Sequence, residues 1–175
     1  MYRYGHYGAG LLVYAPLAFV VTGLGFRQLA LGGALVVVAL AMLPDQDQRV
    51  PLVPHRGPTH TVWFALLVGG ACGYLGLLAG QRTGIDLGVG QSFGAGVGLA
   101  AFGFLLGTLT IGSHIAADAL TPMGVRPFSP LVSKKYSYNL TRASNPISNY
   151  LLFLMGVFGL TVALFGTQNV LHWIR

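Results

Sequence analysis

Long apolar stretches alternate with short polar segments along the whole chain. Each stretch is longer than an ordinary helix of a soluble core, and each ends at a polar or proline-containing segment. The stretches cover residues 8–26, 28–44, 61–80, 93–119 and 148–170. About 20 apolar residues span the hydrocarbon of a bilayer, where only a helix satisfies the backbone of an isolated segment. We therefore predict an all-α fold, a polytopic transmembrane bundle of about five helices that forms one domain over residues 1–175.

The fourth apolar stretch carries glycines four residues apart, as in Gly94 and Gly98 and again in Gly103 and Gly107. Small residues at this spacing let neighbouring helix backbones approach closely. We therefore predict that residues 93–119 form a helix that packs tightly against another span.

Composition supports a membrane location. Apolar residues make up 54% of the chain and charged residues only 8%, and the mean hydropathy is +0.66. These values exclude an ordinary water-soluble domain. The net charge of +6 would suggest nucleic acid in a soluble protein, but in a membrane protein basic residues first report orientation.

Five crossings place the N-terminus and the loops 45–60 and 121–147 on one side of the membrane. Seven of the ten basic residues lie on that side, namely Arg3, Arg49, Arg56, Arg126, Lys134, Lys135 and Arg142. Arg27, Arg82 and Arg175 lie on the other side. Because cytoplasmic loops are enriched in Lys and Arg, we predict a multi-pass protein of the cell inner (plasma) membrane with a cytoplasmic N-terminus.

The same alternation gathers the ionisable residues at the cytoplasmic rim. Glutamate is absent from the chain, so the acids are four aspartates. The rim receives His6, His55, His60, His114, Asp45, Asp47 and Asp118. His172 and Asp86 fall on the opposite side, and we exclude them. This convergence of imidazoles and carboxylates predicts one polar site.

The segment SHIAAD places His114 and Asp118 four residues apart. On a helix both side chains project from one face, which suits one imidazole and one carboxylate on a single cation. The alternative is a hydrogen bond that locks the end of the helix. A charged carboxylate near hydrocarbon costs several kcal/mol unless it is paired, so Asp118 requires a partner in either case.

The segment LPDQD places Asp45 and Asp47 just after a helix that Pro44 helps to terminate. Two carboxylates this close can converge on a hard cation or bridge two of them. The alternative is an acidic turn in water. Carboxylates packed together without a cation repel each other, and a metal ion removes that repulsion.

The segment HRGPTHT follows in the same loop. Thr59 is expected to cap the third helix and His60 to emerge in its first turn as a candidate ligand. Arg56 offers a planar charged fork for phosphate or carboxylate oxygens, although it could equally anchor the loop at lipid headgroups. His55 is a candidate for ligation, for orienting a ligand or for proton transfer. His6 is either a ligand or an interfacial residue among tyrosines.

These motifs occur in an order that resembles a widespread prokaryotic family. The order is a histidine before the first helix, then L-P-D-x-D, H-R-G-P-T-H-T and S-H-x-x-x-D-x-x-T-P-x-G-V-R-P-F-S-P. The members of this family are membrane-bound, metal-dependent hydrolases, also described as LexA-binding and inner-membrane-associated. The resemblance covers nearly the whole chain. It implies a divalent-metal site with His6, Asp45, Asp47, His60, His114 and Asp118 as candidate ligands. It also implies that Arg56 faces the substrate and that Thr121, Pro122 and Gly124 shape a loop over the site.

The resulting hypothesis is a membrane-embedded, divalent-metal-dependent hydrolase with Arg56 and His55 as its catalytic residues. The expected substrate is an anionic amphiphile, a phospholipid or polyprenyl-phosphate-like ester or phosphoester. Mixed His and Asp ligands favour zinc or manganese over calcium. Membrane lipids are the expected partners, and oligomerisation is left open. Anionic headgroups explain the basic loop with Tyr136 and Tyr138 better than nucleic acid does.

Two other classes of function stay open on the sequence. A metal-ion transporter or sensor would require ligands distributed through the membrane thickness. A non-catalytic scaffold would bind a regulator through the basic loop and use the polar cluster only to lock helices. A zincin-type protease is excluded because the chain has no H-E-x-x-H and no glutamate. No P-loop or G-x-S-x-G motif is present either.

Overall fold

The computed structural model describes residues 1–51, 54–83 and 93–173, and the regular elements in these ranges are helices. The elements are α1 (Arg3–Gly23), α2 (Arg27–Leu40), η1 (Pro44–Arg49), η2 (Pro58–His60), α3 (Val62–Thr83), α4 (Phe93–Ala119) and α5 (Pro146–Trp173), where η1 and η2 are short 3₁₀-helices. Five spans in the described residues are long and apolar enough to cross a membrane. The predicted all-α bundle of five helices is therefore confirmed.

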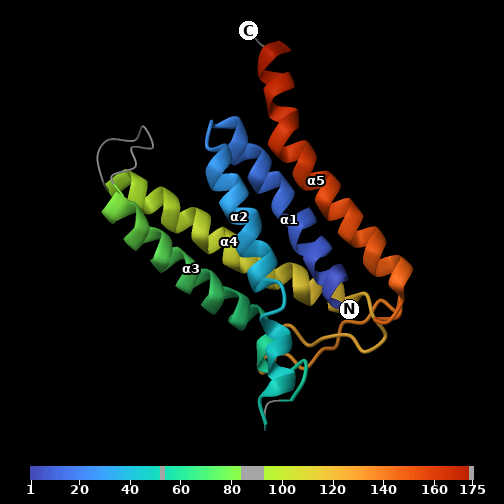
Figure 1. Cartoon of the computed structure of the whole chain (residues 1–175). Helices are drawn as coiled ribbons and strands as arrows, with labels where there is room; N and C mark the ends of the chain where they lie inside the picture. Colours follow the sequence, from blue (N-terminus) through green and yellow to red (C-terminus); the bar gives the residue numbers. More distant parts are fainter. Residues whose placement is uncertain (52–53, 84–92, 174–175) are drawn as a thin grey trace.

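The helices alternate in direction, so the connections gather at two ends (Figure 1). The N-terminus, the η1–η2 segment and the segment between α4 and α5 lie at one end, and the last described residues of α5 lie at the other. Leu120 to Asn145 form no regular element beyond one antiparallel bridge between Val125 and Tyr136. The N–H of Tyr138 donates to the carbonyl of Ala119 at 2.8 Å, so this segment satisfies part of the end of α4.

Two pairs of helices pack most closely, α3 with α4 and α1 with α5. Glycines make both contacts: Gly8 of α1 lies against the backbone of α5 at Leu152, and Gly103 of α4 lies against the backbone of α3 at Cys72. A Cβ atom at either glycine would collide with main-chain atoms. The predicted close packing of residues 93–119 is thus confirmed at Gly103, and the α1–α5 contact is its counterpart in the other pair.

The α1–α2 hairpin completes the bundle and carries the larger apolar core. Tyr14 is buried there, and its hydroxyl donates to the carbonyl of Ala30 at 2.8 Å. A second apolar cluster, which includes Ala65, Ile111 and Val125, lies at the end of α3 and α4 that faces the loops. This cluster supports the polar residues described below.

Two helix boundaries differ from the predicted ones. α1 begins at Arg3 rather than at residue 8. Gly8 is a weak helix former, but α5 packs against the helix at this residue. The tertiary contact therefore overrides the low helix propensity. α2 ends at Leu40 rather than at residue 44. Pro44 has no N–H with which to continue the helix, and it begins η1 instead.

α5 begins at Pro146, two residues before the predicted start. The Asn145 side chain accepts hydrogen bonds from the backbone N–H groups of Ile147 and Ser148 at 3.0 and 3.3 Å. An Asn cap followed by proline in the first helical position is a recognisable start signal.

Candidate metal centre

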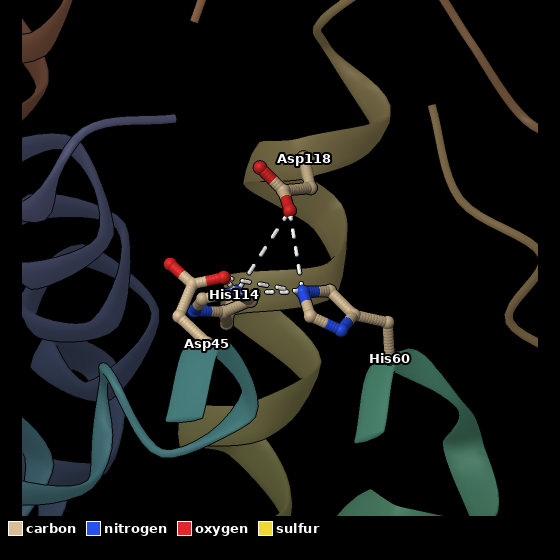
Figure 2. A group of neighbouring side chains, drawn as sticks. All are labelled: Asp45, His60, His114 and Asp118. Atoms are coloured by element: carbon tan, nitrogen blue, oxygen red, sulfur yellow. Dashed lines mark hydrogen bonds and ion pairs between the residues drawn. The ribbon is translucent and has the colours of Figure 1, made fainter. Parts of the chain in front are cut away.

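Four side chains from three elements converge at the end of the bundle that carries the N-terminus. Asp45 comes from η1, His60 from η2, and His114 and Asp118 from the last turns of α4. One ligand atom of each lies within 4.8 Å of all the others. Figure 2 shows the four side chains turned toward a common point between the helices.

The distances between these atoms suit a single cation. His114 Nε2 lies 3.2 Å from His60 Nε2, and Asp45 Oδ1 lies 3.5 Å from each of these nitrogens. Asp118 Oδ2 lies 3.5 Å from His60 Nε2 and 3.8 Å from His114 Nε2. Two ligands of one tetrahedral ion with bonds of about 2.0–2.1 Å stand about 3.3–3.4 Å apart.

Both rings present Nε2 to the centre because Nδ1 is engaged elsewhere. His114 Nδ1–H donates to the carbonyl of Ala41 at 2.7 Å, a group that lies just beyond the end of α2. The Thr59 hydroxyl donates to Asp47 at 2.7 Å, which leaves its oxygen to accept from His60 Nδ1 at 3.0 Å. Such outer partners fix the tautomer and orientation of metal-binding histidines.

Burial of these side chains costs free energy unless a cation lies between them. His60 and His114 are 0% exposed and Asp118 is 1% exposed. Among the residues that the structure describes, Asp118 Oδ2 is a buried oxygen with no hydrogen-bond partner. An unsatisfied buried carboxylate oxygen costs several kcal/mol, which a divalent cation between the four side chains would offset. The residues present therefore fit a divalent metal ion.

A proton competes with a cation for His60. Burial disfavours the charged ring, but the Asp118 and Asp45 carboxylates outweigh that effect and raise the pKa of His60 above its usual range. The two Nε2 lone pairs of His60 and His114 face each other across 3.2 Å, an arrangement that either a shared cation or a proton on His60 stabilises.

His6 lies in the first turn of α1, not before the helix as predicted. Its ring stacks on that of His114 with 3.7 Å between centroids, and Nε2 lies 3.6 Å from Asp118 Oδ1 and 3.9 Å from Asp45 Oδ2. Within the described part of the chain neither ring nitrogen of His6 has a hydrogen-bond partner. The structure thus brings His6 to the site, and its role as a ligand stays a prediction.

Asp47 lies on the far side of His60. Its Oδ2 accepts hydrogen bonds from the Arg56 amide at 3.1 Å and the Thr59 hydroxyl at 2.7 Å, and it lies 3.4 Å from His60 Nδ1. Its Oδ1 accepts from His55 Nδ1 at 2.9 Å. Asp47, His55 and His60 form a second group of possible metal ligands. Direct ligation by Asp47 stays a prediction, and the contacts shown organise the loop that carries His60.

Arg56 lies against the opposite side of Asp118. Its Nη2 donates to Asp118 Oδ1 at 2.9 Å, and its Nη1 donates to Thr121 Oγ1 at 3.1 Å and the Gly124 carbonyl at 3.0 Å. The amino group of Met1 also contacts Asp118 Oδ1. The backbone of Arg56 has a φ of 60°, a left-handed conformation that costs roughly 1–2 kcal/mol in a residue with a side chain. Its hydrogen bonds offset this strain and hold the guanidinium in place.

A pocket of about 370 Å³ opens above the cluster toward the end of the bundle. Asp45 and Asp118 contribute to its floor, and His55, Arg56 and Arg142 also line it. Side chains that could hold a metal ion are thus accessible to a small charged group from outside. Thr121, which was predicted to shape a loop here, lines the same pocket.

Some local predictions at the site are wrong and some residues were missed. Thr61, not Thr59, caps α3, because Thr61 Oγ1 accepts the N–H of Phe64 at 3.3 Å. His172 lies in α5 near the opposite end of the bundle, as expected, whereas Asp86 lies outside the described residues. Sequence reasoning missed Asn149 of α5, which is buried and accepts the Tyr2 N–H at 3.0 Å. A polar residue in an apolar span was the available signal.

The fold and the cluster define a class of protein: a helical membrane protein with a buried His and Asp group at one end of its bundle. Residues 1–174 match the sequence model of the YdjM inner membrane protein family. The chain therefore belongs to this family and is an inner membrane protein. Comparison with curated proteins and with solved structures found no match.

Proposed function

We propose that this protein is a divalent-metal-dependent hydrolase that cleaves an ester or phosphoester bond of an anionic amphiphile. One observation carries the proposal: four ligand atoms, three of them from buried residues, converge within 4.8 Å beneath a pocket that is also lined by an arginine. Asp45, His60, His114 and Asp118 would hold the ion, with zinc or manganese favoured by the mixture of imidazole and carboxylate. A metal ion next to an arginine would suit a substrate that carries a charged phosphoryl or acyl oxygen.

A bound divalent cation would supply Lewis acidity and lower the pKa of a water molecule toward about 7. Arg56 would neutralise charge that develops on the substrate. Its Nη atoms are engaged by Asp118, Thr121 and Gly124, whereas its buried Nε has no partner among the described residues. The contacts of the Nη atoms fix the position of the guanidinium, so its charge would act on the substrate from a fixed place.

His55 is the residue suited to move a proton. Its Nδ1–H donates to Asp47 Oδ1 at 2.9 Å, which fixes the tautomer and leaves Nε2 to exchange a proton. The side chain is 35% exposed and lines the pocket above the cluster. Asp47 would thereby act as a positioning residue for His55 and for the Arg56 amide together.

The arrangement favours an enzyme over a transporter. Apart from His172, the histidines and aspartates of the described residues gather at one end of the bundle, and an ion pathway would distribute them through its length. An amphiphile could present its headgroup at this end while its chains stay in the bilayer. A phospholipid or a polyprenyl phosphate has this shape.

The test uses purified protein in detergent micelles with labelled phospholipids and polyprenyl phosphate esters. We expect bound zinc or manganese, product release that chelator abolishes, and restoration by the added ion. Asp118→Ala should lose both the ion and the activity. Asp86→Ala, which alters a carboxylate predicted on the other side of the membrane, should lose neither. Bound metal without hydrolysis, together with ion flux in sealed vesicles, would support the transporter instead.

A further inference from the structure

A second, larger pocket lies on the outer side of the turn that carries His55 and Arg56. Its volume is about 930 Å³. One wall is apolar and consists of Trp63, Phe64 and Leu67 from the first turns of α3. Trp63 is 45% exposed and Leu67 is 68% exposed. Since α3 is a candidate membrane span, this wall faces the lipid chains of the bilayer.

Basic side chains line another part of this groove. Arg56 and Arg126 line it, and a neighbouring pocket of about 240 Å³ is bordered by the same two arginines and by Lys135. Among the residues that the structure describes, no acidic side chain lines either pocket. In the described part of the chain neither Arg126 nor Lys135 forms an ion pair. The Arg56 guanidinium is paired with Asp118, so the unpaired guanidinium beside the apolar wall is that of Arg126. A free guanidinium next to an apolar wall matches a phosphate headgroup with hydrocarbon chains attached.

The groove also connects to the candidate metal centre. His55 and Arg56 line both the groove and the pocket whose floor contains Asp45 and Asp118. Arg56 therefore stands between a surface open to the bilayer and the carboxylates of the centre. A headgroup held at the outer side of Arg56 would need to pass only this turn to reach them.

We propose that this groove binds an anionic glycerophospholipid drawn from the surrounding bilayer. Its chains lie along Trp63 and Leu67, and its phosphate lies against Arg126, on the outer side of Arg56. Binding itself requires no metal ion. The proposal rests on the proposed function only for the next step, in which the bound headgroup moves past Arg56 to the metal centre.

Trp63 provides a direct probe of occupancy because Trp173 is the only other tryptophan in the sequence. Trp173→Phe protein would be reconstituted in vesicles with brominated phosphatidylglycerol or brominated phosphatidylcholine at equal mole fractions. We expect stronger quenching of Trp63 by the anionic lipid, with an apparent preference of about fivefold, because one basic residue near a surface is worth about 1 kcal/mol toward an anionic lipid. Chelator should leave the preference unchanged.

The matched variants are Arg126→Gln and Arg3→Gln. Both remove one exposed arginine from the same end of the bundle, but only Arg126 lines the groove. Arg126→Gln should abolish the preference, Arg126→Lys should retain most of it, and Arg3→Gln should leave it intact. Equal quenching of Trp63 by the two lipids in the protein that retains Arg126 would overturn the proposal, and so would an unchanged preference in Arg126→Gln. A preserved preference without any hydrolysis would refute the proposed enzyme and support the lipid site.

Discussion

Replacing His114 by alanine removes one of the four side chains that converge at the candidate metal centre. The ring is fully buried, its Nδ1 is held by the Ala41 carbonyl, and its Nε2 lies within 3.2–3.8 Å of the other three ligand atoms. We therefore expect His114→Ala to weaken metal binding without altering the rest of the bundle.

The size of the effect follows from linkage. Losing an outer partner of a metal ligand costs about 10–100-fold in affinity, so losing the ligand itself should cost at least about 100-fold. At a free ion concentration about 100 times the dissociation constant, the ion stabilises the unsubstituted protein by about 2.7 kcal/mol. At the same concentration the variant would be stabilised by only about 0.4 kcal/mol.

The assay compares thermal unfolding in detergent with the ion and with chelator, together with the metal content of the purified protein. The increment between the two conditions is the measured quantity, because the unpaired Ala41 carbonyl lowers stability by a similar amount in both. Ser113→Ala is the control, since this buried neighbour donates to the Thr110 carbonyl at 2.7 Å and lies outside the cluster. Unchanged metal content and an unchanged increment in folded His114→Ala protein would refute the proposed centre.

Three further outcomes are expected. Gly8→Ala should destabilise the protein by about 1–3 kcal/mol or more, because the new Cβ would collide with the backbone of α5. Gly32→Ala is the control: its Cβ would meet nothing within 4 Å, so the substitution should be neutral or stabilising when the unfolding of both variants is measured. Metal affinity should fall as pH is lowered through the raised pKa of His60, because the proton must leave before the ion binds; competition with a chelator at several pH values would measure this, and a flat profile would contradict it. Arg56→Lys should keep the metal but lower kcat/KM on a cleaved lipid roughly 10–100-fold, because one ammonium cannot replace a guanidinium bonded to three groups.

The sequence was sufficient for the number of spans and for the meeting of the polar residues at one end. Both follow from hydropathy length and from alternation, which are properties of the whole chain and need no knowledge of side-chain packing. The pairing of His114 with Asp118 was also readable, because a spacing of four residues fixes their common face once the segment is helical. The order of the motifs carried the family resemblance, and the resemblance added the set of candidate metal ligands.

The finer geometry depends on contacts between segments that are distant in sequence. Asp45 and Asp47 lie two residues apart and looked equivalent, yet Asp45 faces His114 while Asp47 is engaged by the Arg56 amide and the Thr59 hydroxyl. Both aspartates lie in one 3₁₀-helix, which a pattern of apolar positions could not predict. Likewise the early start of α1 depends on the packing of α5, which no local propensity reports.

The distribution of the cluster along the chain also constrains how the protein is made. His6 leaves the ribosome well before Asp118, which emerges only after α1, α2 and α3 have been synthesised and most of α4 has followed. An early imidazole must therefore wait, exposed to water or to lipid headgroups, until the hairpin of α3 and α4 has inserted beside it. The candidate ion-binding group is thus completed only once α4 has been made, and any metal that it acquires is loaded after that point.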